Sequence, residues 1–388
     1  MRGSQCLNPM PERYPDPTLR RIDRAVTRAA KAPDLLHYLT PVNLESERRR
    51  FLKKQGTRNP AFSYRLPELD PIVQKRTLHR IPLEEIADSE IQQLYVDVVQ
   101  DCSNRLDLLQ SLGTERFLYD SLRYFGRPGR QELKDAEFLL HGAPLAADEQ
   151  EETLPLVDTT RIFEDTARDH GFSCSIEYTD RLISKALAGP RGLRIRKNVR
   201  FSAQETRALA HHEIGVHYLT TLNARRQPLC VLQIGLPVNT ITQEGLGVLS
   251  EYLSGNLTLQ RLREIALRVI AVHEVVEGTE FRHTFQRLVE QYEIDPERAF
   301  DVTVRAYRGR GFTKDYVYLR GFRTMLLRFQ SGQTLDALLI GKTHHDYQPV
   351  LERMIAKRLL HPPAFQTVAF AKPAAPDPIL AYLVRSLR

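Results

Sequence analysis

Residues 201–220 read F-S-A-Q-E-T-R-A-L-A-H-H-E-I-G-V-H-Y-L-T, and residues 242–253 read T-Q-E-G-L-G-V-L-S-E-Y-L. A helix is predicted to begin at Ser202, a favourable N-cap, and Glu205 three residues later completes the pattern of a capping box. The second stretch is predicted to form another helix. Together the two helices carry the histidine and glutamate pattern on which the functional interpretation depends.

The two histidines of the first helix, His212 and His217, are five residues apart and Glu213 lies between them. In a regular helix this spacing separates the side chains by roughly 140° around the axis, so both cannot face one ion. A π-bulge, or a helix that ends near His217, brings them together, and Gly215 eases such a distortion. If the helix is distorted, Glu244 of the second helix completes a set of two histidines and one carboxylate. Such a set leaves a fourth zinc position open for water.

The segments H-E-I-G-V-H, Q-E-G-L-G and R-G-F-T-K-D (residues 310–315) resemble the family of microtubule-associated tyrosine carboxypeptidases and their bacterial relatives. The matching motifs fall within residues 195–325. The resemblance implies a zinc cofactor and four functional residues: the zinc ligands His212, His217 and Glu244, and the general base Glu213. Gly247 occupies a position at which the family usually has alanine, which we interpret as a small change.

A carboxypeptidase also needs a cation for the terminal carboxylate of its substrate, and arginine binds a carboxylate through two parallel hydrogen bonds. Four basic residues lie in or beside the third matching segment and are predicted to bind substrate: Arg305, Arg308, Arg310 and Lys314. Tyr318 is predicted to act in catalysis by hydrogen-bonding the developing oxyanion. Without the resemblance, a basic cluster of this kind is more typical of a solvated turn.

Glu251 lies seven residues after Glu244, so the two carboxylates share one face of the second helix. The family motif places the metal ligand at Glu244. Glu251 is then predicted either to accept a hydrogen bond from the imidazole N–H of a ligand histidine, or to be an ordinary acidic residue on the helix surface.

The chain has 388 residues and a net charge of +7, from 55 Lys and Arg against 48 Asp and Glu. This charge is mild and diffuse, and the basic residues show no aromatic interleaving, so a nucleic-acid partner is not favoured. The four cysteines are scattered, and no apolar run is long enough to span a membrane. The N-terminus lacks the apolar region of a secretory leader. We therefore expect a cytoplasmic protein with reduced thiols and no membrane partner.

Helical periodicity dominates, which predicts an α+β fold, mostly α, with a small sheet beside the histidine helix. Strands are predicted at residues 172–178 and 193–201, and the second is either an edge for extended substrate or a plain core strand. Four parts are predicted along the chain: a loose segment (1–16), a helical part (17–145), a catalytic part (146–361) and a proline-rich tail with a short helix (362–388).

These features predict a zinc-dependent metallocarboxypeptidase that hydrolyses the C-terminal bond of a peptide or protein. The resemblance alone implies that the released residue is aromatic. The alternative is a noncatalytic regulatory or binding protein with a structural metal site. A fourth protein ligand, such as Glu251, favours the alternative, whereas an open position facing a cleft favours the enzyme.

Overall fold

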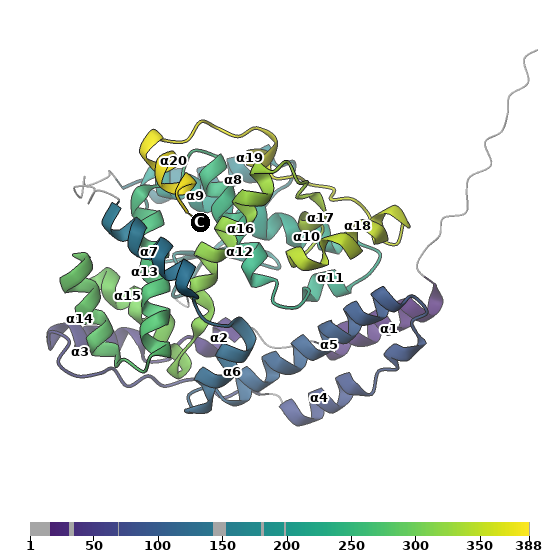
Figure 1. Cartoon of the computed structure of the whole chain (residues 1–388), viewed down its shortest axis with the longest axis horizontal. Coiled ribbons are helices and arrows are strands. Elements are labelled where there is room, and N and C mark those ends of the chain that lie inside the picture. Colours follow the sequence, from purple (N-terminus) through teal and green to yellow (C-terminus); the bar gives the residue numbers. More distant parts are fainter. Residues whose placement is uncertain are drawn as a thin grey trace, which may run out of the picture.

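The computed structural model of the chain describes residues 16–30, 35–68, 70–142, 153–179, 182–197 and 199–387. Within these residues the chain is mostly helical and contains a small mixed sheet, which confirms the predicted α+β class (Figure 1). The predicted loose segment lies outside the described residues except for Asp16, and so does the predicted boundary at residue 145. That division of the chain stays a prediction.

The elements that precede the sheet are helical. They are α1 (Pro17–Ala29), α2 (Leu35–Leu39), α3 (Leu44–Lys53), α4 (Pro71–His79), the 3-10 turn η1 (Leu83–Glu85), α5 (Ser89–Gln110), α6 (Arg116–Phe125), α7 (Arg130–Gly142) and α8 (Leu156–Asp169). Asp88 caps the longest of them, α5, by accepting hydrogen bonds from the N–H groups of Glu90 and Ile91.

The elements that follow the sheet are also helical. They are α9 (Ala203–His212), the π-helix η2 (Glu213–Tyr218), α10 (Leu219–Arg225), α11 (Val231–Ile234), α12 (Thr240–Leu253), α13 (Leu259–Val276), α14 (Phe281–Tyr292), α15 (Pro296–Tyr307), the 3-10 turns η3 (Arg308–Arg310) and η4 (Thr313–Tyr316), α16 (Val317–Gln330), α17 (Asp336–Leu339), the 3-10 turn η5 (His345–Tyr347), α18 (Gln348–Ala356), α19 (Val368–Ala371) and α20 (Pro378–Arg385).

The sheet has the order β1 (Ser175–Thr179), β3 (Gly192–Arg196), β2 (Ala186–Gly189), with β1 parallel and β2 antiparallel to the central strand. Of the two alternatives for the strand at residues 193–201, the edge is therefore wrong and the core strand is confirmed over residues 193–196, because β3 is paired on both sides. The edge nearest the histidine helix is β2, which the sequence analysis did not predict. Its sequence, A-L-A-G, is short and lacks the β-branched residues that mark strands.

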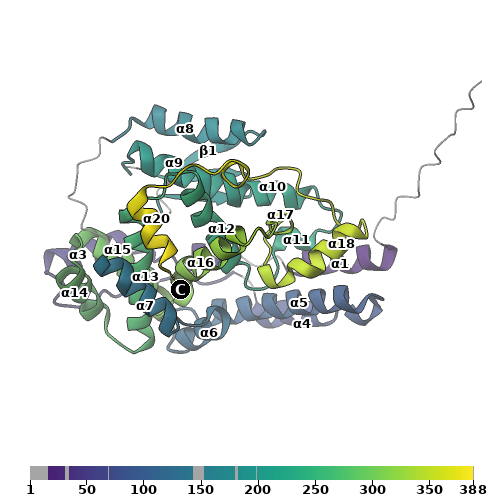
Figure 2. The ribbon, with the colours of Figure 1, turned by 45° about the horizontal axis from the view of Figure 1, so that its top comes forward.

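Helix α12 runs through the middle of the molecule, and every residue from 242 to 253 is buried. Figure 2 shows α8 and the sheet on one side of it and the pair α4 and α5 on the opposite side. Its backbone lies directly against α16, because a side chain at Gly245 would overlap the backbone of Gly321. A helix that carries a carboxylate into the core is thus held in place by backbone contact at the residue that follows the carboxylate.

Segments far apart in the sequence share the same core. Ile22 and Tyr95 of the N-terminal helices belong to one buried cluster with Leu232 and Leu351. The C-terminal segment returns to the histidine helix, where the Thr367 hydroxyl donates a hydrogen bond to the carbonyl of Gly215. The tail therefore takes part in the structure around the candidate site.

Candidate active site

The N-terminus of the histidine helix forms as the sequence predicts. The Ser202 hydroxyl accepts a hydrogen bond from the N–H of Glu205 at 3.1 Å, which confirms the N-cap of α9. The Glu205 carboxylate pairs with Lys185 rather than closing a capping box. The cap therefore fixes the start of the helix ten residues before His212, the first predicted zinc ligand.

The helix changes to π-geometry over η2, between His212 and His217. Of the two distortions considered from the sequence, a π-bulge and a helix end near His217, the structure has the first. The two imidazole centroids lie 4.8 Å apart with an angle of 76° between the rings. A π-turn adds one residue to the repeat, so side chains five apart come to the same face.

Side-chain hydroxyls stabilise this irregular segment by donating to its backbone carbonyls. Thr220 and Thr221 donate to the carbonyl of His217, at 3.0 and 2.9 Å. Ser250 of α12 donates to the carbonyl of His211, at 3.1 Å. Because a π-turn breaks the regular hydrogen-bond ladder, such donors offset part of its cost.

Glu244 of α12 faces both imidazoles. Its Oε2 lies 3.4 Å from His212 Nε2 and 3.7 Å from His217 Nε2, and one ligand atom from each residue falls within 4.8 Å of the other two. The structure therefore brings together the three predicted zinc ligands, which we call the triad. His212 and Glu244 are buried and His217 is half-buried.

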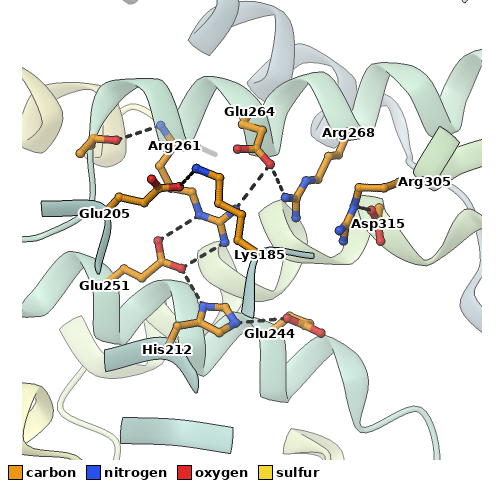
Figure 3. Close-up of polar contacts among 11 residues, drawn as sticks. Lys185, Glu205, His212, Glu244, Glu251, Arg261, Glu264, Arg268, Arg305 and Asp315 are labelled. Atoms are coloured by element: carbon orange, nitrogen blue, oxygen red, sulfur yellow. Dashed lines mark hydrogen bonds and ion pairs between the residues drawn. The ribbon is translucent and has the colours of Figure 1, made fainter. Parts of the chain in front are cut away.

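Behind this triad, Glu251 contacts the opposite nitrogen of His212, Nδ1, at 2.6 Å (Figure 3). This is the first of the two roles considered from the sequence. Two hydrogen bonds from Arg261, at 3.1 and 3.2 Å, hold the same carboxylate. Since Nδ1 is bound to Glu251, Nε2 of His212 is left for a metal.

Arg261, Glu264 and Arg268 continue this chain of alternating charges along α13 (Figure 3). None of the three was predicted from the sequence. Their spacing of three and four residues along α13 places them on one face of the helix, and this is the pattern that could have identified them.

The surrounding charges favour a cation at the triad. Burial lowers the pKa of His212, but hydrogen bonds to Glu244 and Glu251 outweigh it and raise the pKa to about 9. Burial raises the pKa of Glu244, but Lys314 and the two imidazoles hold it well below its usual range. The carboxylates that favour a proton on the imidazole equally favour a bound metal ion.

Gly247 has a specific role in this packing. A Cβ placed there would lie 2.5–2.7 Å from atoms of the His212 ring. From the sequence, we interpreted the glycine at this position, where the family usually has alanine, as a small change. In this structure the ring occupies the space that an alanine methyl group would fill.

Glu213 follows directly in the π-helix and is nearly buried. Its Oε2 accepts a hydrogen bond from the backbone N–H of Ala188, on the outer side of β2, at 2.6 Å. The predicted general base is therefore oriented by the free edge of the sheet.

One cavity of about 1890 Å³ is lined by the three predicted ligands, by Glu213 and by Glu251. Tyr318 and the predicted cations Arg305, Arg308 and Lys314 line the same cavity. The Tyr318 ring lies parallel to His212, at 6.5 Å between centroids and 23°. Lys314 Nζ binds Glu244 Oε1 at 2.7 Å. Lys314 thus contacts a predicted ligand directly.

Arg310 is different from the other predicted cations. It does not line the cavity, its side chain is 58% exposed, and it lies 3.5 Å from Glu115. Its left-handed backbone, with φ of 80°, belongs to the turn between α15 and α16. Closeness in sequence therefore did not bring Arg310 into the cavity with the other three predicted cations.

The family model for the microtubule-associated tyrosine carboxypeptidases matches residues 49–388. The chain belongs to this family. The match confirms the resemblance drawn from the motifs and extends it well beyond them, into the N-terminal helices.

The chain is similar in sequence, at low identity, to two mammalian relatives of this family. Microtubule-associated tyrosine carboxypeptidase 1 of Mus musculus is 25% identical over 348 residues, which cover 85% of this chain and 65% of the relative. The Homo sapiens protein of the same name is 25% identical over 338 residues, 82% of this chain and 61% of the relative. The chain thus spans less than two thirds of these relatives. None of its described helices is long and apolar enough to cross a membrane.

Proposed function

We propose that the chain is a zinc metallocarboxypeptidase that removes the C-terminal residue of a peptide or protein. The observation that supports this most strongly is the convergence of His212, His217 and Glu244 on one wall of a cavity, with Glu213 beside them. The names of the relatives, tyrosine carboxypeptidases, motivate the further proposal that the released residue is aromatic.

The triad fits zinc. Tetrahedral zinc with ligand bonds near 2.1 Å places its ligand atoms about 3.4 Å apart. Glu244 lies 3.4 and 3.7 Å from the two imidazole nitrogens, so only small shifts are needed. Glu251 contacts the far nitrogen of His212, so it is not a fourth ligand to the same ion, and this favours the enzyme over a closed structural site.

Zinc bound there would lower the pKa of a water toward about 7 and polarise a carbonyl group. The chain's own residues would do the remaining work. Glu213 accepts the proton of the attacking water and passes it to the leaving amine. Tyr318, stacked beside His212, donates a hydrogen bond to the oxyanion. The free edge of β2 lies next to Glu213 and lines the cavity, so it is suited to hold extended substrate backbone.

The test is mass spectrometry of a short peptide that ends in tyrosine, incubated with the purified chain. Loss of the last residue alone is expected, with cleavage abolished by a chelator and restored by zinc. Internal cleavage, or full activity after metal removal, would contradict the proposal.

A further inference from the structure

Four of the cations that line the cavity surround Asp315, and three of these four pair with a carboxylate. Arg268 pairs with Glu264, Arg305 pairs with Asp315, and Lys314 binds Glu244; the fourth cation is Arg308. Among the described residues the structure gives Arg308 no hydrogen bond or ion pair to a carboxylate, and its buried Nε has no partner. Arg308 lines the cavity and is only 3% exposed.

The surroundings hold this guanidinium in place without neutralising it. Its Cζ lies 4.7 Å from the centre of the Phe312 ring, a cation–π contact. The next residue, Gly309, has φ of 69°, and its N–H donates to the Tyr64 hydroxyl at 2.7 Å. A side chain at Gly309 would lie 2.5 Å from Phe117, so the turn is fixed by packing as well.

The charge balance differs between neighbouring arginines. Burial lowers the pKa of Arg305, but Asp315 more than compensates and raises it. Burial lowers the pKa of Arg308 to about 10, since Asp315 compensates only in part and Arg305 adds repulsion. A buried cation without its own counter-ion is destabilising, so its presence in a cavity wall indicates an anionic ligand.

We propose that Arg308 binds the free C-terminal carboxylate of the substrate. The planar guanidinium offers two parallel donors to one carboxylate, and the cavity that it faces also contains the triad. This inference rests on the proposed function and makes it more specific, because it selects one cation from the basic cluster. A carboxylate could also come from an acidic side chain near the substrate's end, and the test separates the two sources.

The test measures binding rather than cleavage, in the zinc-loaded Glu213→Gln background. Three fluorescent peptides are compared: one ending in Ala-Tyr with a free acid, the same peptide as an amide, and an amide with glutamate before the tyrosine. The free acid is expected to bind about 10-fold to 100-fold more tightly than either amide. A charge-assisted hydrogen bond typically contributes this much to binding affinity. Arg308→Met should reduce the free acid to the affinity of the amide, whereas Arg310→Met should keep the difference.

Two further measurements distinguish loss of carboxylate binding from loss of folding. Arg308→Met should melt at or above the temperature of its parent, because it removes an unpaired buried charge, and Arg308→Lys should lose part of the acid preference while keeping the charge. The inference is overturned if Arg308→Met and Arg308→Lys retain the full preference for the free acid, or if only the glutamate-containing amide depends on Arg308. If the chain with Glu213 intact cleaves nothing, yet the acid preference still requires Arg308, the proposed function fails and this inference stands.

Discussion

Two groups of histidines and acids in the described part of the chain each bring three ligand atoms within 4.8 Å: His212, His217 and Glu244, and His344, His345 and Asp346. Their geometry differs. The first group joins a π-helix to a buried helix, and its imidazoles meet at 76°. In the second, adjacent residues stack their rings at 22° and 4.2 Å, and the Asp346 side chain is 75% exposed. Stacked, nearly parallel rings are less suited to sharing one ion than rings that meet at a steep angle.

The charges around the two groups differ even more. Burial lowers the pKa of both His212 and His344. Two carboxylates reverse the effect at His212, whose pKa rises to about 9, whereas the neighbouring His345 adds to it at His344, whose pKa falls to about 4. The same residue types therefore favour a cation at one place and disfavour it at the other. The charges around the ligand residues therefore distinguish the two groups as candidate metal sites.

The largest expected effect separates the two groups directly. A His212→Ala, His217→Ala double variant should lose all bound zinc, because two of its three protein ligands are gone. The matched His344→Ala, His345→Ala variant should keep one zinc per chain. Elemental analysis of both purified proteins measures this, and the reverse pattern would show that the wrong group was chosen.

The next effect concerns Glu213, the carboxylate that stands beside the first group. Glu213→Gln should lower kcat by about 10²–10⁴-fold, because an amide cannot accept the proton of the attacking water. Its zinc content should be unchanged. Undiminished turnover of a peptide ending in tyrosine would remove Glu213 from the mechanism.

A smaller effect tests the contact behind the ligand. Glu251→Gln should weaken zinc binding by roughly 10-fold to 100-fold, since the carboxylate orients His212 through Nδ1. Glu264→Gln is the control, because Glu264 belongs to the same chain of charges through Arg261. Competition with a chromogenic chelator gives both affinities. Equal losses in the two variants would mean that general charge, and not this contact, supports the site.

The smallest effect compares two glycines of α12. Gly247→Ala should displace the His212 ring and weaken zinc binding by about 10-fold, with little change in Tm. Gly245→Ala should instead lower Tm, because its methyl group meets the Gly321 backbone, and overpacking of this kind costs about 1–3 kcal/mol. Chelator competition and thermal melting separate the two, and a Gly247→Ala variant with unchanged zinc affinity would refute the role given to the glycine.

Local features of the candidate site were predictable from the sequence. The five-residue spacing required a distorted helix if both histidines were to face one ion, Gly215 made that distortion easier, and Ser202 predicted where the helix begins. Both depend on a few neighbouring residues. The fold class followed in the same way from helical periodicity along the chain.

Features that depend on distant contacts were not predictable in this way. Arg310 lies two residues from Arg308, yet only Arg308 reaches the cavity, because the left-handed turn between them is set by packing against Phe117. The edge strand β2 is too short to show a pattern. The importance of Gly247 depends on where the His212 ring lies, which a sequence pattern does not contain.

An anomalous difference map, measured at the zinc absorption edge from crystals grown with zinc, tests the proposed zinc site most directly. We expect one strong peak per chain, about 2.0–2.2 Å from His212 Nε2, His217 Nε2 and a Glu244 oxygen. A peak at His344 and His345 instead, or no peak near the π-helix, would contradict it.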